Sequence, residues 1–167
     1  PKSFWEKIYE PFIRRAAGLG ALSGLHNSDT YEKAYAFCDL LIIGGGPSGL
    51  MAAKIAAEAG LDVILAEQEP IFGGRLNSET EKVDGILGSD WVAKIIEELK
   101  ELDNVRLFLR TTVTGVYDQG TFAAVERVGH HLPDRGNDRP LECFWRFVAK
   151  NSILAAGAIE RAIAFPN

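Results

Sequence analysis

The sequence predicts an α/β protein in which a parallel sheet has helices on both faces and continues into an antiparallel β meander. Three observations lead to this fold class. The glycine-rich run GGGPSG at residues 44–49 lies between an apolar strand-like segment and an alanine-rich helical segment. Strand-like and helix-like segments alternate as far as residue 109. Beyond that residue, short strands separated by turn residues predict antiparallel pairing.

The composition is that of an ordinary globular domain. The 167 residues are 47% apolar and 25% charged, which allows one hydrophobic core. The net charge of −5 and the lack of a basic stripe count against binding to nucleic acid. The sequence shows no signal peptide and no apolar run near the roughly 18 residues that a membrane helix needs. We therefore expect a cytoplasmic protein that contacts neither nucleic acid nor membrane.

Cysteine and histidine show no pattern of a disulfide framework or a metal site. Cys38 and Cys143 are far apart in strand-like segments and are expected to be buried, unreactive thiols. The three histidines lack partners at metal-ligand spacing. Because no set of nucleophile, base and acid can be assembled either, we predict no catalytic residue and no metal ligand in this chain.

Residues 1–30 are predicted to form an N-terminal helix and a connector. Between residues 4 and 17 the apolar side chains fall on one side of a helix, which Pro11 is expected to kink or break. This apolar side needs a partner, which we expect to be another part of the protein or another subunit. Docking on a membrane surface is disfavoured because the helix has few cations.

The elements that follow are predicted from periodicity and from turn residues. Gly60 is expected to end the helix after the glycine run, and Ser89 to be the N-cap of the next helix. In chain order we predict a short helical approach at 31–37, a strand at 39–43, a helix at 47–59, a strand at 62–67, a loop at 68–81, a helix at 90–102, a strand at 105–109, a hairpin of strands at 112–117 and 121–128, an exposed loop at 129–140, a strand at 143–149 and a short buried return strand at 152–156.

The glycine run indicates the chemistry of the chain. Gly44, Gly46 and Gly49 have the GxGxxG spacing between a strand and a helix. The first glycine permits a tight turn, the second lets a pyrophosphate approach the backbone, and the third lets the helix pack on the strand. The free N–H groups at the helix N-terminus, with Pro47 in the first turn, favour a phosphate. The sequence therefore predicts a Rossmann-like dinucleotide site.

Three further features extend the predicted site. Glu67 ends the next strand at about the twenty-residue distance expected for a ribose contact, and its charge would repel a 2′-phosphate, so NAD or FAD is favoured over NADP. Gly74 allows close backbone approach, and Arg75 is placed to pair with a pyrophosphate, although an ordinary surface turn would look the same. Ala156 and Gly157 end the return strand in small residues, which either leave room for a cofactor or serve close packing.

Four stretches resemble the α-subunit family of heterotetrameric sarcosine oxidases, which belong to the flavoproteins with two dinucleotide-binding domains. The stretches are residues 9–20, 31–39, 110–113 and 157–161. Together with the strand–helix–acid unit, the Gly-Gly-Arg loop and the return strand, they extend the resemblance across nearly the whole chain.

The resemblance implies a function. Enzymes of this family oxidise sarcosine to glycine and pass the one-carbon unit to tetrahydrofolate or release it as formaldehyde. Their α subunit holds a non-covalent NAD, while FAD lies in the β subunit, with FMN near the α–β interface. By resemblance, Ser48 lies at the pyrophosphate, Glu67 and Gln68 at the adenosine ribose, Arg75 near the phosphates and Val113 at the adenine edge. Ser48 replaces the more usual Ala, a change too small to block binding.

The length of the chain departs from this family, whose α subunit is several times longer. We therefore expect residues 31–167 to be the first, truncated part of a dinucleotide-binding domain, with an incomplete sheet. Such a segment is expected to be inactive alone, to bind dinucleotide weakly or to associate with itself, and to assemble with other subunits of a hetero-oligomeric oxidase. The alternative is an FAD-binding fragment of a related opine oxidase or cyanide-forming glycine oxidase.

Overall fold

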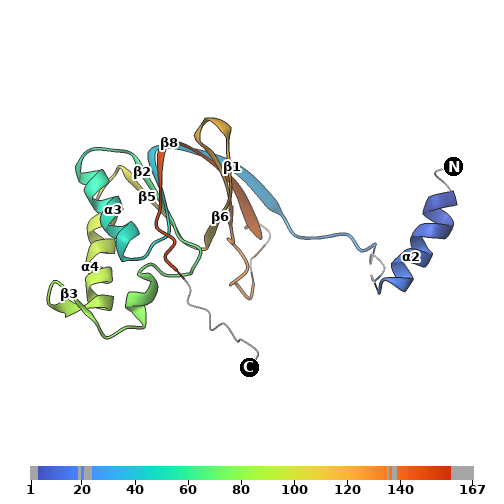
Figure 1. Ribbon diagram of the computed structural model, residues 1–167, viewed down its shortest axis with the longest axis horizontal. Helices are drawn as coiled ribbons and strands as arrows, with labels where there is room; N and C mark the ends of the chain where they lie inside the picture. Colours follow the sequence, from blue (N-terminus) through green and yellow to red (C-terminus); the bar gives the residue numbers. More distant parts are fainter. Residues whose placement is uncertain (1–3, 19, 21–23, 135, 137–138, 159–167) are drawn as a thin grey trace, which may run out of the picture.

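The computed structural model describes residues 4–18, 20, 24–134, 136 and 139–158. Its strands include β1 (Tyr31–Ile43), β2 (Val63–Ala66), β5 (Val105–Phe108), β6 (Thr111–Tyr117), β7 (Thr121–Glu126) and β8 (Glu142–Leu154). They form one six-stranded sheet in the order β5-β2-β1-β8-β7-β6 (Figure 1). The pairs β5–β2, β2–β1 and β1–β8 are parallel, whereas β8–β7 and β7–β6 are antiparallel. The predicted α/β class, with a parallel sheet and a β meander, is confirmed.

Two helices connect the parallel strands. Helix α3 (Pro47–Glu58) joins β1 to β2, and helix α4 (Gly88–Lys100) joins β2 to β5. Between β2 and α4 lie the 3-10 turn η2 (Gly74–Asn77) and a small hairpin of β3 (Lys82–Val83) and β4 (Ile86–Leu87), and the 3-10 turn η3 (Asp118–Gly120) joins β6 to β7. Helices α3 and α4 lie where the periodicity predicted them to within a few residues, whereas η2 and the β3–β4 hairpin were not predicted.

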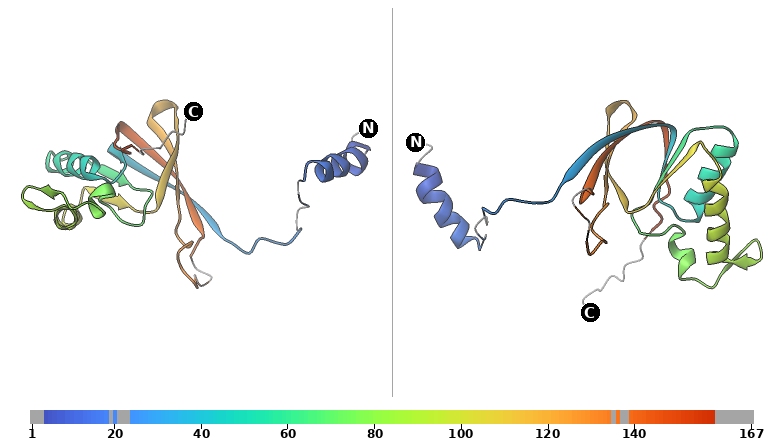
Figure 2. Two further views of the ribbon diagram at one scale, coloured as in Figure 1. Left: turned by 60° about the horizontal axis from the view of Figure 1, so that its bottom comes forward. Right: turned by 180° about the vertical axis from the view of Figure 1, so that it is seen from behind.

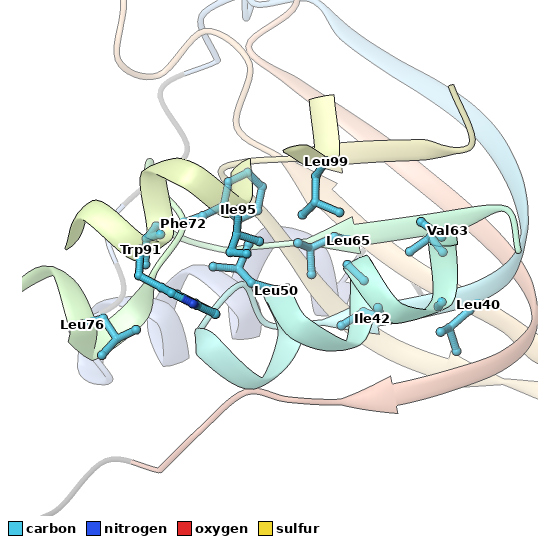
Figure 3. Close-up of a cluster of buried hydrophobic side chains, with 14 residues drawn as sticks. Leu40, Ile42, Leu50, Val63, Leu65, Phe72, Leu76, Trp91, Ile95 and Leu99 are labelled. Carbon is cyan, nitrogen blue, oxygen red and sulfur yellow. The ribbon is translucent and has the colours of Figure 1, made fainter. Parts of the chain in front are cut away.

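The two faces of the sheet are covered by different kinds of structure. Helices α3 and α4 both pack on one face, in a cluster with strand residues such as Ile42 and Leu65 (Figure 3). The opposite face is covered by the meander, where Leu41 and Ile64 pack in one cluster with residues of β7 and β8. The prediction of helices on both faces is therefore wrong, because the antiparallel strands take the place of helices on the second face.

The sheet is strongly curved, which is how the meander reaches this second face. The ring of Phe108 in β5 contacts the rings of Trp145 and Phe147 in β8, with centroids 5.0 and 5.1 Å apart. Strands β2 and β1 lie between β5 and β8 in the sheet, so these rings meet only because the sheet bends around them.

Strand β1 starts at Tyr31, well before the predicted strand. The expected short helical approach at residues 31–37 is wrong, because these residues pair in parallel with β8. Their burial follows the strand period of two: Ala36 and Cys38 are buried, while Tyr35 and Phe37 are exposed. The partner strand that holds this segment extended lies more than a hundred residues along the chain, so local spacing gave no sign of it.

Strand β8 is one strand of 13 residues where two separate strands were predicted. Strand β7 pairs with it as far as Val148, and beyond that residue β1 is its sole partner among the described strands. The return strand at 152–156 was expected to be buried, but Leu154 is 76% exposed. This end of β8 is exposed because the described residues cover only one of its edges.

The ends of the two helices differ in how well they were predicted. Helix α3 ends at Glu58, and Gly60, with φ +83°, terminates it as expected. The N–H groups of Gly60 and Leu61 donate to the carbonyls of Ala57 and Ala56, at 2.9 and 3.1 Å, which is a Schellman motif. Helix α4 begins at Gly88, so Ser89 lies inside the helix and is not its N-cap, because the β3–β4 hairpin leads directly into the first turn.

The N-terminal helix consists of the π-helical turn η1 (Trp5–Tyr9) and α2 (Glu10–Ala16). Pro11 lies in the first turn of α2, where it marks the change of helix type and leaves the helix continuous. The helix lies apart from the sheet, and Phe12 is 74% exposed (Figure 2). Among the described residues, no helix combines the length and the apolar character needed to cross a membrane.

Both cysteines are free and buried, as predicted. Burial is the main cause that raises the pKa of the Cys38 thiol, to about 11. Burial also raises the pKa of Cys143. Little thiolate therefore forms at neutral pH, and neither residue has the character of a nucleophile.

Replacing Leu50 by Ala tests the packing of α3 on the sheet. Leu50 is fully buried among Ile42, Leu65 and α4, so we expect Leu50→Ala to lower the free energy of unfolding by about 3 kcal/mol. The control is Ile55→Ala, on the exposed side of the same helix, which should change it by less than about 1 kcal/mol. Denaturant unfolding measures both changes. Equal losses of stability would show that the Leu50 face of α3 is not the face packed on the sheet.

Candidate dinucleotide-binding site

A cavity of about 780 Å³ lies where the carboxyl ends of β1, β2 and β8 meet. This is the edge of a parallel sheet at which ligands bind in open α/β folds. Most of the predicted site residues line it, namely Gly44, Gly46, Pro47, Ser48, Glu67, Gln68, Gly74, Arg75, Ala156 and Gly157. The lining thus brings together residues from four separate parts of the sequence.

The glycine loop is held between β2 and the end of β8. The Gly44 N–H donates to the Ala66 carbonyl at 2.8 Å, and its φ of +108° is one that L side chains rarely adopt. A Cβ on Gly44 would lie 2.4 Å from the Ala155 oxygen, so only glycine fits beside the neighbouring chain. Gly46 differs, because a Cβ there would meet no atom within 4 Å and would enter the open cavity.

Gly49 has a packing role and does not line the cavity. A Cβ on Gly49 would lie 1.9 Å from the Gly44 carbonyl oxygen, so the first turn of α3 rests against the end of β1. The first hydrogen bond of the helix is donated by Leu50 to Gly46, at 2.9 Å. The N–H groups of Ser48 and Gly49 precede it and have no acceptor within the helix, so the helix N-terminus presents donors at the cavity.

Glu67 is buried, at 8% exposure, and its carboxylate joins two loops. One oxygen, Oε2, accepts from the Gly45 N–H at 2.6 Å, and the other, Oε1, accepts from the Glu69 N–H at 2.8 Å. Each oxygen retains a lone pair for a further donor. The side chain therefore fixes the glycine loop at the same time as it lines the cavity.

Gly45 and Glu69 are site residues that sequence reasoning missed. A Cβ on Gly45 would lie 2.4 Å from a ring carbon of Phe72, so the middle glycine is needed for packing although the GxGxxG pattern leaves it free. Glu69 lines the cavity, and its carbonyl accepts from the Arg110 N–H at 3.0 Å. The three consecutive glycines were the available signal for Gly45, whereas Glu69 had none.

The Gly-Gly-Arg loop packs directly on the glycine loop. The Gly73 N–H donates to the Gly45 carbonyl at 2.8 Å, and a Cβ on Gly74 would lie 3.3 Å from Cα of Gly46. Arg75 follows on the cavity wall, where its Nε donates to Oε1 of Glu79 at 2.7 Å. Glu79 is another lining residue that the sequence did not indicate.

Val113 is the predicted site residue that lies elsewhere. It belongs to β6, at the far edge of the sheet, and packs against the cluster on the second face. It does not line this cavity, although β6 begins beside it, where the Thr111 N–H donates to the Glu67 carbonyl at 2.7 Å.

The described lining of the cavity is acidic, and it includes no assembled set of nucleophile, base and acid. Its described lining includes the carboxylates of Glu67, Glu69 and Glu79 and one cationic side chain, Arg75. Among the described residues, no group of three or more His, Cys, Asp or Glu side chains is placed to hold a metal ion. The arrangement can hold a diphosphate at the helix N-terminus and hydroxyl groups at Glu67.

These features define the class of the protein. A parallel sheet with a glycine loop, a helix N-terminus and a buried acid at the end of the second strand is a dinucleotide-binding domain. The sequence model of the family described as FAD dependent oxidoreductase matches residues 39–125, about half of the chain, and the chain belongs to that family.

Curated relatives show which members of this family the chain is similar to. The sarcosine oxidase α subunit of Rhizobium meliloti (strain 1021) is 47% identical over 165 residues, which are 99% of this chain and 17% of that protein. The protein of the same name from Corynebacterium sp. (strain U-96) is 35% identical over 153 residues, 90% of this chain and 16% of that protein. The chain thus spans about a sixth of these relatives. The predicted resemblance to sarcosine oxidase α subunits is confirmed.

Solved structures share the fold over most of the chain. L-proline dehydrogenase from P. horikoshii matches with a TM-score of 0.59 at 25% identity, covering 86% of this chain and 27% of that chain. Thioredoxin reductase from Streptococcus pyogenes MGAS5005 matches with a TM-score of 0.55 at 27% identity, covering 80% and 39%. The fold therefore corresponds to one part of larger oxidoreductases.

Replacing two glycines of the same motif by alanine should affect different properties, stability at Gly49 and ADP binding at Gly46. We expect Gly49→Ala to destabilise the fold by several kcal/mol, because its Cβ has no space against Gly44. Gly46→Ala should leave stability within about 1 kcal/mol, because Gly46 has an extended backbone and open space, but it should weaken binding of ADP by about tenfold or more. Thermal unfolding and calorimetric titration with ADP distinguish the two, and full ADP affinity in Gly46→Ala would contradict this placement of the phosphates.

Proposed function

We propose that this chain is the NAD-binding portion of the α subunit of a sarcosine oxidase. The observation that carries the proposal is the cavity at the strand ends, where the glycine loop, the N-terminus of α3 and the Glu67 carboxylate converge. In this function the chain binds and orients a dinucleotide, and we assign it no bond-breaking step.

The fit to a diphosphate rests on the open space at Gly46 and on the helix N-terminus. The unpaired N–H groups of the first turn of α3 and the positive end of the helix dipole stabilise phosphate charge. Ser48 adds a small side chain at the cavity wall, and Arg75 adds the positive charge. These residues would hold the pyrophosphate of NAD, whose nicotinamide supplies hydride chemistry when it is bound.

The fit to an unmodified ribose rests on the acids beside it. Glu67 keeps lone pairs for the two hydroxyl groups, and Gln68 lines the same part of the cavity. Glu67 and Glu69 would both repel a 2′-phosphate, which has about two negative charges at neutral pH. This supports NAD or FAD over NADP.

The substrate and the partners come from the relatives. Their names describe a sarcosine oxidase and one of its subunits, so we propose oxidative demethylation of sarcosine as the reaction of the whole enzyme and further subunits as partners. FAD and FMN are proposed to lie elsewhere in that assembly. Because this chain spans about a sixth of those relatives, the groups that contact sarcosine are expected outside it.

A second candidate is an FAD-binding segment of a related oxidase. It is favoured by the family match, which is to FAD dependent oxidoreductases, and by an opine oxidase component of Agrobacterium tumefaciens (strain Ach5), 30% identical over 135 residues, 78% of this chain and 26% of that protein. The same cavity suits both, because NAD and FAD share the ADP part that the described residues would hold.

The identity of the bound dinucleotide is directly measurable. We expect purified protein loaded with NAD to be colourless and to release NAD on denaturation, identified by mass spectrometry. A yellow protein that releases FAD would instead support the second candidate. Titration should also show tighter binding of NAD than of NADP, because the acids at the ribose end repel the extra phosphate.

Substituting Glu67 tests the assignment of the ribose. Glu67→Gln removes the charge and replaces one acceptor oxygen by a donor, so we expect NAD binding to weaken by about tenfold, the effect of losing a charge-assisted hydrogen bond. The control is Glu101→Gln, an exposed residue at the end of α4, which should leave affinity unchanged. Unchanged affinity in Glu67→Gln would contradict the ribose role. Circular dichroism shows whether a weakened affinity is caused by unfolding instead.

A further inference from the structure

An ion pair on the cavity wall neutralises its positive charge. Arg75 is the sole cationic side chain among the described residues that line the cavity, and its Nε donates to Oε1 of Glu79 at 2.7 Å. Both side chains line the same cavity as the glycine loop. A diphosphate entering the cavity therefore meets a paired guanidinium, whose charge Glu79 already balances.

The backbone fixes this pair in place. The Arg75 carbonyl accepts from the N–H groups of Ser78 and Glu79, at 3.0 and 3.1 Å, so the two side chains stand one turn apart. Leu76 between them is buried, and Gly73 ties the turn to Gly45 of the glycine loop. The position of the turn is thus set by the core and by the phosphate loop.

The Arg75 side chain nevertheless has freedom to change partners. It is 72% exposed, and the Glu79 side chain is 33% exposed, so water and salt can reach the pair. Such exposed pairs are weak, and a phosphate is a strong competitor for a guanidinium because two N–H groups can bind it at once. Glu67, another acid of the wall, instead accepts from the backbone N–H groups of Gly45 and Glu69.

We propose that Glu79 lowers the affinity of the cavity for diphosphates by holding Arg75 in an ion pair, and is therefore a positioning residue that sets how tightly the ADP part is held. The inference rests on the proposed function, in which Arg75 lies near the phosphates. Removing the charge of Glu79 leaves Arg75 with its full positive charge, and the affinity for a diphosphate rises.

The test is a calorimetric titration of the chain with ADP. Glu79→Gln keeps an oxygen that can accept from Arg75 Nε but removes the negative charge. We expect it to bind ADP about two- to fivefold more tightly than the unaltered chain, the range that an exposed ion pair provides. The gain should be larger at low ionic strength, because salt screens exposed charges. Adenosine, which has no phosphate, should bind both proteins equally.

Two controls separate this role from a general change of charge or stability. In an Arg75→Met background, Glu79→Gln should lose most of its effect, because no guanidinium remains to be released. Glu97→Gln removes an acid from another exposed ion pair, with Lys100 on α4 outside the cavity, and should leave the affinity for ADP unchanged. Thermal unfolding of each variant reports any loss of structure.

The outcomes distinguish the inference from the proposed function. If the unaltered chain binds ADP but Glu79→Gln binds it no more tightly, or gains equally with Met at position 75, the role of Glu79 is overturned while the nucleotide site stands. If no variant, Glu79→Gln included, binds ADP, NAD or FAD, both proposals are overturned.

Discussion

The whole arrangement depends on how closely the start of α3 approaches the end of β1. Gly49 rests on the carbonyl oxygen of Gly44 with no space for a Cβ, and this contact fixes the helix axis relative to the strand. The N-terminus of α3 then points its unpaired N–H groups at one spot beyond the sheet. Larger side chains at either position would move the helix outward, and the donors would no longer converge with the residues that follow β2 and β8.

Around this contact, the loops are joined by hydrogen bonds that run between strands. The Glu67 carboxylate connects the glycine loop to the residues after β2, and Gly45 connects the glycine loop to the Gly-Gly-Arg turn. These bonds use backbone N–H groups, so they hold the chain itself in place and leave side chains such as Arg75 adjustable. The rigid backbone loses little entropy when a diphosphate binds, so the entropic cost to the protein is confined to exposed side chains such as Arg75.

The parts of the structure that the sequence predicted well are those determined by nearby residues. The glycine loop, α3 with its end at Gly60, and the hairpin around residues 118–120 all follow from local spacing and turn chemistry. The first half of β1 and the continuity of β8 did not follow, because each is held extended by the other. The meander covers the second face of the sheet because the sheet is curved, and local sequence patterns do not predict this curvature. The pairing of Arg75 with Glu79 was equally hidden, since a short helical turn was not expected there.

The pairing of β1 with β8 also sets the order in which the molecule can form. Tyr35 and Arg146, which interact across these strands, are 111 residues apart in the chain. Contacts between such distant residues cost loop-closure entropy before they return any stability, so they form late and slowly. During synthesis β1 emerges long before β8. The edge of β1 that pairs with β8 therefore stays without that partner until the chain has been made beyond residue 142. Residues 155–157, which close one wall of the cavity, follow directly after β8. The binding site is thus complete only when β8 is paired with β1, and a dinucleotide that binds there stabilises this paired state.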